Sequence, residues 1–381
     1  MKTAVYTSKD ISEEAFRELY REVTTKFGRY DYLLFSIYPS LDMQESAQHI
    51  ETLFQTDKFA AFHAIEHFSN RDIVKESISV CCFAFEKEAY IETFAIADVA
   101  AESALQEAAN YFNEKSDKFH IILAGLCSGD IAPVIDRLSA KLNYEPIDNI
   151  VGGVSSGFLQ KSMMQTYQYI DKQLITNGFV ILSFSNVEAA IEVSLGFKAY
   201  GITYEVTKAV GNRLYEVDNG ENFAAIMLKM LNATNEYADI RNLWYAPITV
   251  LSGENGYRST MRTVSDCTEE YIEFFAPVKE GDYIKLSFAT EEDIIEADKD
   301  AAALLIQKIQ NPEISLNFSC IARQYILEDL QKREIEVYED TFKTTLFGFF
   351  TFGEIGPDTM YKKLSFYNET SLAVLIREKD A

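Results

Sequence analysis

The sequence is poor in the residues on which several common functions depend. Its 381 residues include four histidines, one tryptophan and seven prolines, and 35 basic residues stand against 59 acidic ones. The formal net charge of −24 repels nucleic-acid phosphates and anionic lipid surfaces, so we expect neither a nucleic-acid partner nor a membrane partner. The longest apolar stretches, such as GFVILSF at 178–184, are far shorter than the roughly 20 residues of a membrane-spanning helix.

Cysteine usage and the N-terminal residues exclude further classes of protein. The five cysteines are odd in number and form no CxxC pair, which argues against a disulfide framework and against a zinc knuckle. The first residues, MKTAVYTSKDISEEAF, lack the basic, apolar and small-residue regions of a signal peptide. We therefore expect a cytoplasmic protein without structural disulfides.

The composition that remains is that of a globular α/β chain. Hydrophobic residues make up 48% and aromatic residues 13%, which predicts an aromatic-rich core. The pattern predicts strands at 32–37, 59–68 and 78–85 and an amphipathic helix at 44–54. The polar segment 233–242 and the segment around 211–213 are predicted loops.

Internal repetition is the most informative pattern. RYDYLLFSIYPSLDMQESAQHIETLF matches KFHIILAGLCSGDIAPVIDRLSAKLN, with Tyr32 aligned to Ile121 at an offset of 89 residues. Phe62 aligns with Val151 at the same offset, so the register holds across strand, helix and strand. These matches define an internal repeat of 30–100 and 119–197.

A third copy of the pattern lies near the C-terminus. EISLNFSCIARQYILEDLQKREIEVYE aligns Leu316 with Leu123 and Cys320 with Cys127, and LFGFFTFGEIG aligns Gly348 with Gly152. The unit is strand, helix and then a run of strands. We predict an α+β (mixed α/β) fold of repeated strand-helix-strand units, forming mixed β-sheets flanked by helices, with two lobes related by pseudo-symmetry.

Short motifs also follow one another in a recognisable order. In the N-terminal half they are DYLLFS (31–36), IVGGVSSGF (150–158) and FVILSF (179–184). In the C-terminal half they are LSFAT (286–290), FSCIAR (318–323), GFFTFGEIG (348–356) and YNETSLAVLI (367–376). The ordered set resembles the FIST domains, the paired N- and C-terminal modules of bacterial intracellular signal-transduction proteins. YEVTKAVGNRLYEVD (204–218) marks the junction, so the resemblance implies modules at 1–212 and 213–381.

The resemblance implies an intracellular sensor of a small ligand, with an amino acid as a candidate, and implies no enzymatic activity. Many members are fused to a kinase, a cyclic-di-nucleotide enzyme or a chemoreceptor output domain. We expect this chain to act through a separate signalling protein, such as a histidine kinase, a cyclic-di-nucleotide enzyme or a chemoreceptor. Some members of the family are implied to be haem proteins that detect nitric oxide. A sensor of nitric oxide that binds haem b is therefore an alternative function for this chain.

The candidate ligand contacts lie in the C-terminal motifs. Arg323 in FSCIAR suits a ligand carboxylate, and Cys320 beside it could be a reactive thiol. In GFFTFGEIG, read as one strand, Glu354 shares a face with two phenylalanines and suits an ammonium group, with Thr351 as a further candidate. Asn368 in YNETS is a candidate polar contact. The alternatives are an Arg323 that pairs with a structural acid, a solvated Glu354, and a turn at YNETS.

The glycine-rich segment GGVSSG at 152–157 offers backbone amides and Ser155 to a ligand. The alternative is that Gly152 and Gly153 permit close backbone packing. The segment also matches G-x-S-x-G in form, which leaves a cryptic hydrolase using Ser155 or Cys320 as an alternative. However, the residues that follow do not have the helical pattern of a nucleophile elbow.

The scarce histidines bear on the haem alternative. No CxxCH attachment motif is present, so a haem would be bound without covalent attachment. His63 and His67, four residues apart in AFHAIEHFS, would face the same side if that segment were a strand. The alternative for each is a histidine satisfied within the core. No metal ligand set is predicted, and a purely structural interaction module remains a further alternative.

Overall fold

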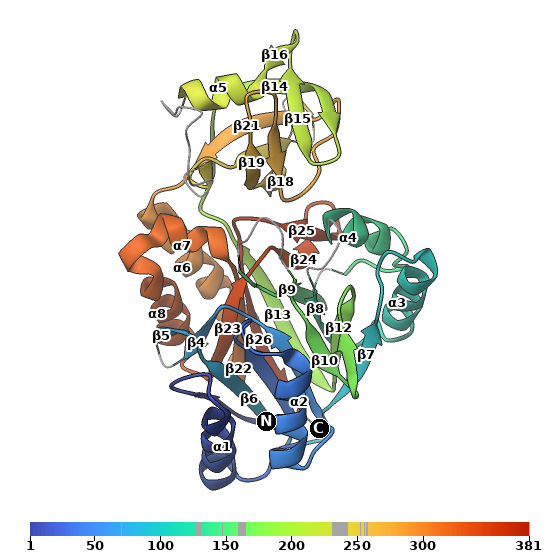
Figure 1. The fold of residues 1–381 in the computed structure, drawn as a ribbon, viewed down its shortest axis with the longest axis vertical. Helices are drawn as coiled ribbons and strands as arrows, with labels where there is room; N and C mark the ends of the chain where they lie inside the picture. Colours follow the sequence, from blue (N-terminus) through green and yellow to red (C-terminus); the bar gives the residue numbers. More distant parts are fainter. Residues whose placement is uncertain are drawn as a thin grey trace.

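The structure is a computed structural model and describes residues 1–69, 71–125, 131–146, 148–158, 165–230, 243–251, 253–254, 256 and 258–380. It has a large lobe and a small lobe, the latter formed by the middle of the chain (Figure 1). The predicted loop at 233–242 and the aligned Cys127 lie outside the described residues.

The large lobe contains three six-stranded sheets built to one plan. In spatial order, the first sheet is β1 (Lys2–Thr7), β6 (Ile78–Ala84), β2 (Tyr32–Ile37), β3 (Phe59–His63), β10 (Gln168–Ile170) and β11 (Gln173–Ile175). The second is β25 (Lys363–Tyr367), β24 (Glu354–Asp358), β9 (Ile150–Val154), β8 (Phe119–Ala124), β12 (Phe179–Ser185) and β7 (Tyr90–Ile96). The third is β13 (Val187–Ser194), β26 (Ser371–Glu378), β22 (Ile314–Cys320), β23 (Leu346–Thr351), β4 (Glu66–Ser69) and β5 (Asp72–Lys75).

Each sheet is centred on one parallel pair of strands, namely β2–β3, β8–β9 and β22–β23. A parallel pair needs a crossover, and helices supply it. The crossovers are α2 (Met43–Phe54), α4 (Ile131–Ser139), and α7 (Ile321–Leu327) followed by η3 (Glu328–Leu330) and α8 (Gln331–Phe342). A second helix precedes each pair: α1 (Glu13–Glu22) continued by η1 (Val23–Phe27), α3 (Glu102–Glu114) and α6 (Glu291–Lys308).

Helix starts follow local sequence signals. Asp42 caps α2 by accepting a hydrogen bond from the Glu45 amide at 2.8 Å. Thr290 and Asp293 form a reciprocal capping box at the start of α6. Such caps satisfy amide groups that lack a partner within the helix and typically stabilise it by about 1 kcal/mol.

The three repeats exchange hairpins. β4–β5 follows β3 in the chain but extends the third sheet, and β10–β11 follows β9 but extends the first. β24–β25 follows β23 but extends the second sheet. The exchange is therefore cyclic, and each sheet is completed by residues from another repeat.

The predicted fold class and repeats agree with this architecture. Tyr32, Ile121, Phe62 and Val151 all lie in one core between the sheets, so the offset of 89 places each on the correct face. The strand pairing equates Tyr32 with Phe119, two residues before the aligned Ile121, so the alignment is shifted by two residues along the strand. Leu316 and Leu123 of the third alignment lie in the same core. Pseudo-symmetry thus relates three repeats within the large lobe.

Two predicted strands were wrong in detail. Residues 59–68 form two strands, β3 and β4, which belong to different sheets. GFFTFGEIG is likewise divided, because Gly353 adopts a positive φ of 114° and the chain passes from the third sheet into the second. A Cβ at Gly353 would lie 2.2 Å from the Phe366 ring, so glycine permits this crossing.

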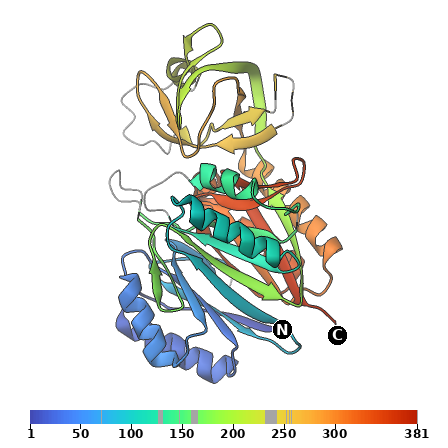
Figure 2. The same ribbon diagram turned by 90° about the vertical axis from the view of Figure 1, so that its right-hand side faces the viewer.

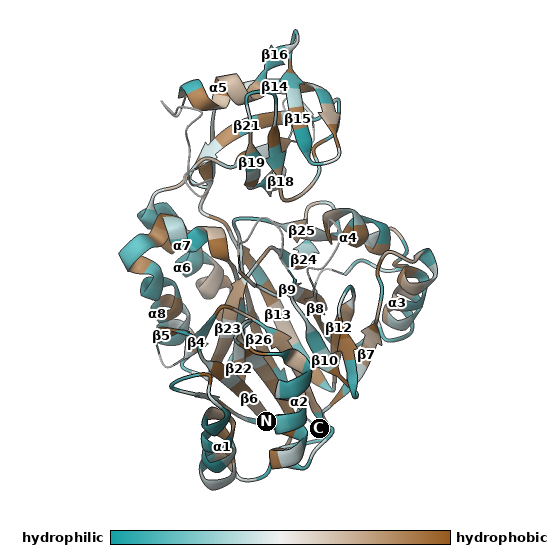
Figure 3. Ribbon diagram, in the orientation of Figure 1, coloured by the Kyte–Doolittle hydropathy of each residue, from teal (hydrophilic) through white to brown (hydrophobic). Residues whose placement is uncertain are grey.

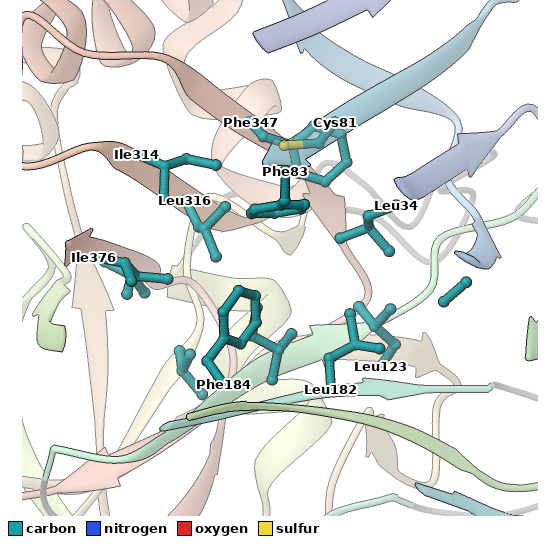
Figure 4. Close-up of a cluster of buried hydrophobic side chains, with 14 of the residues drawn as sticks. Leu34, Cys81, Phe83, Leu123, Leu182, Phe184, Ile314, Leu316, Phe347 and Ile376 are labelled. Carbon is teal, nitrogen blue, oxygen red and sulfur yellow. The ribbon is translucent and has the colours of Figure 1, made fainter. Parts of the chain in front are cut away.

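The shared core lies where the three sheets face one another (Figure 4). The first sheet supplies Leu34, Cys81 and Phe83, the second Leu123, Leu182 and Phe184, and the third Ile314, Leu316, Phe347 and Ile376. Further cores lie between each sheet and its helices, so the central strands are apolar on both faces (Figure 3). Burying one such Leu or Phe contributes about 1.5–3 kcal/mol.

The small lobe is an insertion between β13 and α6 (Figure 2). Its sheet contains β14 (Lys198–Val210), β15 (Arg213–Val217), β16 (Glu221–Asn222), β17 (Ile248–Leu251), β18 (Arg258–Arg262), β19 (Val264–Cys267), β20 (Ile272–Phe274) and β21 (Tyr283–Phe288), with α5 (Phe223–Met230) beside it. β14 bends at a bulge between Tyr200 and Tyr204, so the sheet folds around its own core. The predicted module boundary at 212/213 falls in the turn between β14 and β15.

None of the helices that the structure describes combines the length and the apolar character needed to cross a membrane.

Candidate ligand-binding site

The carboxyl ends of the central parallel strands come together under the small lobe. At the end of β9, the Val154 amide donates to the Gly353 carbonyl at 2.9 Å, and the Phe352 amide donates to the Val154 carbonyl at 3.0 Å. The Ile65 amide, just beyond β3, donates to Ser156 Oγ at 3.1 Å. Strand ends of this kind commonly form ligand sites, because the side chains and loops beyond them converge.

Glu354 lies at this junction and is fully buried. Its carboxylate accepts hydrogen bonds from Thr351 Oγ1 at 2.5 Å and Thr370 Oγ1 at 2.7 Å. Burial, together with the charge of the nearby Glu369, raises its pKa to about 8. The predicted alternative of a solvated Glu354 was wrong, because β24 passes into the second sheet beneath the small lobe.

Glu369 is a second fully buried acid beside the first. It lies in the turn between β25 and β26 with a positive φ of 63°. Thr263 Oγ1 of the small lobe donates to Glu369 Oε1 at 2.7 Å, whereas Oε2 has no hydrogen-bond partner within the described chain. Burial raises its pKa to about 8. We call Glu354 and Glu369 the acid pair.

Other polar groups surround the acid pair. Cys320, the last residue of β22, is buried close to both acids, and burial followed by their charges raises its pKa well above the usual value. A neutral thiol is a poor nucleophile, so the predicted reactive Cys320 is not supported. Asn368 Oδ1 and Ser319 Oγ are buried without hydrogen-bond partners among the described residues. The segment YNETS bends at Asn368 and Glu369, but the Asx-type turn expected there is not formed, because Asn368 Oδ1 accepts no hydrogen bond from the described residues.

Arg323 is placed nearby but is committed to other acids. It is fully buried, and one terminal nitrogen donates to both Asp298 oxygens at 2.8 Å. Its Nε lies 3.6 Å from Glu334 Oε2. Ser194 and Tyr338 also donate to Asp298, at 2.5 and 3.1 Å. Arg323 therefore pairs with a structural acid, as the stated alternative expected, but its Nε and Nη1 have no hydrogen-bond partner among the described residues, so its contact with a ligand carboxylate stays a prediction.

Ser155 lies one strand away, directly after β9. Its Oγ accepts a hydrogen bond from Gln168 Nε2 at 2.9 Å. The residues after it, 155–158, are not helical, so a nucleophile elbow is not formed. The glycines before it serve close packing, since a Cβ at Gly152 would lie 1.8 Å from the Ile122 carbonyl and one at Gly153 2.5 Å from Thr351.

The small lobe reaches the site through a few specific contacts. Besides the bond from Thr263 to Glu369, Tyr245 OH donates to the Tyr325 carbonyl at 2.6 Å and to Glu328 at 2.9 Å. Trp244 is buried against the Tyr325 ring, with ring centroids 4.8 Å apart. The chain enters and leaves the small lobe at two adjacent strand ends, the start of β14 and the end of β21, where Lys198 is paired with Phe288.

The histidines differ in their availability to a haem iron. His67 Nε2 must donate to the Ser77 carbonyl at 2.9 Å, so its Nδ1 accepts from Ser36 Oγ at 2.6 Å and both nitrogens are used. His63 Nε2 is buried without a hydrogen-bond partner in the described structure. Burial lowers the pKa of both to about 4, which leaves neutral imidazoles. However, the Tyr167 amide donates to His63 Nδ1 at 3.3 Å, so Nε2 carries the ring hydrogen. A haem b held by His63 would need the other tautomer and the loss of this hydrogen bond, and its iron would then supply nitric oxide binding.

The contact between Ser36 and His67 has the form of a nucleophile and base, but the same arrangement occurs elsewhere. His120 contacts Ser183 Oγ at 2.8 Å and the Lys115 carbonyl at 2.9 Å within the second sheet. The recurrence favours a structural role in satisfying buried histidines. Within the described residues, no three His, Cys, Asp or Glu side chains are grouped to hold a metal ion.

Comparison with known proteins agrees with the order of the motifs. The FIST N domain matches residues 32–220 and the FIST C domain matches residues 224–357. The chain belongs to the FIST family. FIST domains are associated with signal-transduction sensing.

Relatives of this FIST protein give no further detail. An uncharacterized protein of Aquifex aeolicus (strain VF5) is 28% identical over 267 residues, which span 68% of this chain and 98% of the relative. Among solved structures, a cyanuric acid hydrolase from A. caulinodans covers 100% of this chain and 99% of its own at 9% identity, with a TM-score of 0.33. A second cyanuric acid hydrolase structure covers 99% of both chains at 8% identity and the same TM-score.

Sequence reasoning missed several residues of the site. Glu369 lies inside the YNETS motif, but an acid between two strands is usually solvated, so the motif alone does not mark it as part of a buried site. Asp298, Glu334 and Thr263 carry no local signal, since only the tertiary fold brings them to Arg323 and Glu369.

Proposed function

We propose that this FIST protein is an intracellular sensor that binds a small organic cation at the acid pair and reports through a separate signalling protein. An amino acid or a related amine is the candidate ligand, and no catalytic step is needed. The observation that carries the proposal is that two fully buried acids lie together without a cation. Among the described residues, no ion pair reaches Glu354 or Glu369.

The charge balance supports a cationic ligand. A buried carboxylate is costly unless it is paired, and otherwise it takes up a proton. With pKa values of about 8, both acids hold protons at neutral pH. A ligand ammonium group would favour the ionised form and form charge-assisted hydrogen bonds. Asn368 Oδ1 and Glu369 Oε2 supply acceptors that have no partner in the described structure.

The contact between the lobes supports a route for reporting. Thr263 of the small lobe donates to the same carboxyl group that would receive the ligand. Ionising Glu369 against an ammonium group changes the strength of that bond, so ligand binding would shift the position of the small lobe. A ligand can shift such an equilibrium only by the difference in its affinity for the two arrangements.

The decisive experiment is calorimetry with a panel of amines, such as lysine, ornithine and putrescine, against glutamate and succinate. We expect saturable binding of an amine with release of about one proton per acid ionised. Since the acids ionise near pH 8, affinity should rise from pH 6 to 8 by up to about tenfold per pH unit for each proton released.

The matched variants are Glu354→Gln and Glu369→Gln, with Glu296→Gln as the control. Glu296 is an exposed acid of α6 paired with Lys299, and its loss should leave binding unchanged. Amine binding that survives both buried substitutions, or preference for the dicarboxylates, contradicts the proposal. Absence of binding by every compound leaves the purely structural module as the better explanation.

A second candidate, haem-based sensing, rests on His63 Nε2, which has no hydrogen-bond partner among the described residues but would have to lose its hydrogen to bind iron. We expect added haemin to produce no Soret band. A band that His63→Ala abolishes and His67→Ala retains would replace the amine sensor by a haem sensor.

A further inference from the structure

A cavity of about 370 Å³ lies at the opposite end of the large lobe from the acid pair. It opens at the amino ends of β2 and β3 and is closed on the far side by the start of β7, so it lies between the first and second sheets. Its size is within the range of small-molecule sites in proteins. The amine site and this cavity share no residue.

Tyr32 lines this cavity and is the first reason to regard it as a site. Only 4% of the residue is exposed, and its hydroxyl has no hydrogen-bond partner within the described chain. Leaving a buried hydroxyl unpaired costs about 1–3 kcal/mol. Burial and the nearby Asp171 raise its pKa well above the usual value, so the hydroxyl stays a neutral donor.

The internal repeat shows that this hydroxyl is not required by the fold. Tyr32 begins β2 opposite Phe83, and Phe119 begins β8 in the same place opposite Phe184. In the third repeat, Ile314 begins β22 opposite Ile376. Two of the three equivalent positions are therefore apolar, and the first repeat alone carries a hydroxyl there.

The charged side chains of the cavity are balanced and largely paired. Arg29 contacts Asp31 at 2.9 Å, and Lys87 contacts Asp380 at 2.7 Å. Asp171 accepts a hydrogen bond from Thr93 at 2.8 Å. The lining residues Arg29, Lys58 and Lys87 offset Asp31, Asp57 and Asp171 in charge. Such a lining offers donors and acceptors without favouring a ligand of either charge.

Aromatic surface completes the cavity. Phe85 lines it, and Tyr90 at its mouth is 48% exposed. Flat apolar rings beside polar donors and acceptors match a molecule with hydroxyl groups on one side and C–H groups on the other. We propose that this cavity binds an uncharged, hydroxyl-rich molecule of monosaccharide size, with the Tyr32 hydroxyl as a specific hydrogen-bond partner.

The test is calorimetry of the full chain with glucose, galactose, ribose and myo-inositol, and with the amine panel for comparison. We expect one of the polyols to bind saturably and Tyr32→Phe to weaken its binding about fivefold, since one hydrogen bond contributes about 1 kcal/mol. The same substitution should leave the unliganded protein as stable as before or more so.

The control is Tyr111→Phe, which removes a hydroxyl that is already bonded to Ser183 at 2.9 Å and lies outside the cavity. It should lower stability and leave polyol binding unchanged. Asp57→Asn at the cavity is a second probe should Tyr32→Phe fold poorly, and it should also weaken binding. No saturable polyol binding, or binding unaffected by both cavity substitutions, overturns the inference. Glu354→Gln should not alter polyol binding.

Discussion

Two groups of buried acids lie close together in the third repeat, and they differ by one guanidinium. Asp298 and Glu334 surround Arg323, which donates to both Asp298 oxygens. Among the described residues, Glu354 and Glu369 accept hydrogen bonds from threonines alone. The charge of Arg323 lowers the pKa of Glu369 but forms no ion pair with it. Both groups are fully buried or nearly so.

The difference separates a structural cluster from a candidate site. A buried acid beside a cation has a partner of opposite charge within the protein, even though Glu334 makes no hydrogen bond among the described residues, and removing that cation leaves the acid's charge uncompensated. A buried acid pair without a cation must bind protons or bind a ligand that brings the charge. Burial alone therefore does not distinguish function, whereas the balance of charge within each group does.

The largest expected effect comes from removing the cation of the first group. Arg323→Met leaves Asp298 and Glu334 buried without a positive partner, so we expect a loss of about 3–5 kcal/mol in the free energy of unfolding. Urea denaturation measures it. The conservative Arg323→Lys should lose less, because a charge remains. A loss below about 1 kcal/mol for Arg323→Met would show that the two groups do not differ as described.

A pH-dependent effect should appear in the second group. Both acids bind protons more tightly in the folded state than in the unfolded state, where the pKa is about 4.5. Their stabilising contribution is therefore complete below pH 4.5 and is lost as pH rises through 8, with a slope of up to about 1.4 kcal/mol per pH unit for each group. Burial also raises the pKa of Asp298 to about 7, so this slope is measured as the difference in thermal unfolding from pH 5 to 8 between the wild type and variants of the acid pair.

Glu354→Gln and Glu369→Gln should each flatten that profile, because an amide does not titrate. Glu296→Gln should leave it unchanged. A profile equally steep in the buried variants would assign the pH dependence to other groups and remove the charge argument for the acid pair.

The smallest effect concerns the link between the acid pair and the small lobe. Thr263→Val removes the donor to Glu369 and should cost about 1 kcal/mol. Hydrogen exchange should then speed up at the contacts between the lobes. Thr249→Val is the matched control, because Thr249 bonds to Ser287 inside the small lobe at 2.6 Å. Equal changes between the lobes in both variants would argue against a specific link through Glu369.

The sequence predicted the repeated elements better than their assembly. The alignment of Tyr32 with Ile121 placed both in the shared core, because the alternation of a strand survives in every copy. The passage of β24 and β4 into neighbouring sheets was not predictable, since nothing local marks which sheet a hairpin joins. The small lobe was missed because its insertion lies between β13 and α6, where repeat spacing fails.

The site was predicted in part for the same reason. Cys320, Thr351, Glu354 and Asn368 follow the ends of strands that the motifs marked, and the fold brings them together. Arg323 lies close to them, but its pairing was not predictable, because its partners Asp298 and Glu334 come from two other helices. Pairings between distant segments decide whether a charged residue is free, and a single sequence does not show them.

The exchange of hairpins also determines how the protein can be divided. A fragment containing only the first repeat would lack β10–β11 and leave the edge of β3 unpaired, and it would contribute β4–β5 to a sheet that is absent. Each repeat thus exposes apolar strands until the other two are in place. Folding should be a single cooperative event of high contact order, and cuts at repeat boundaries should give aggregating fragments instead of miniature domains.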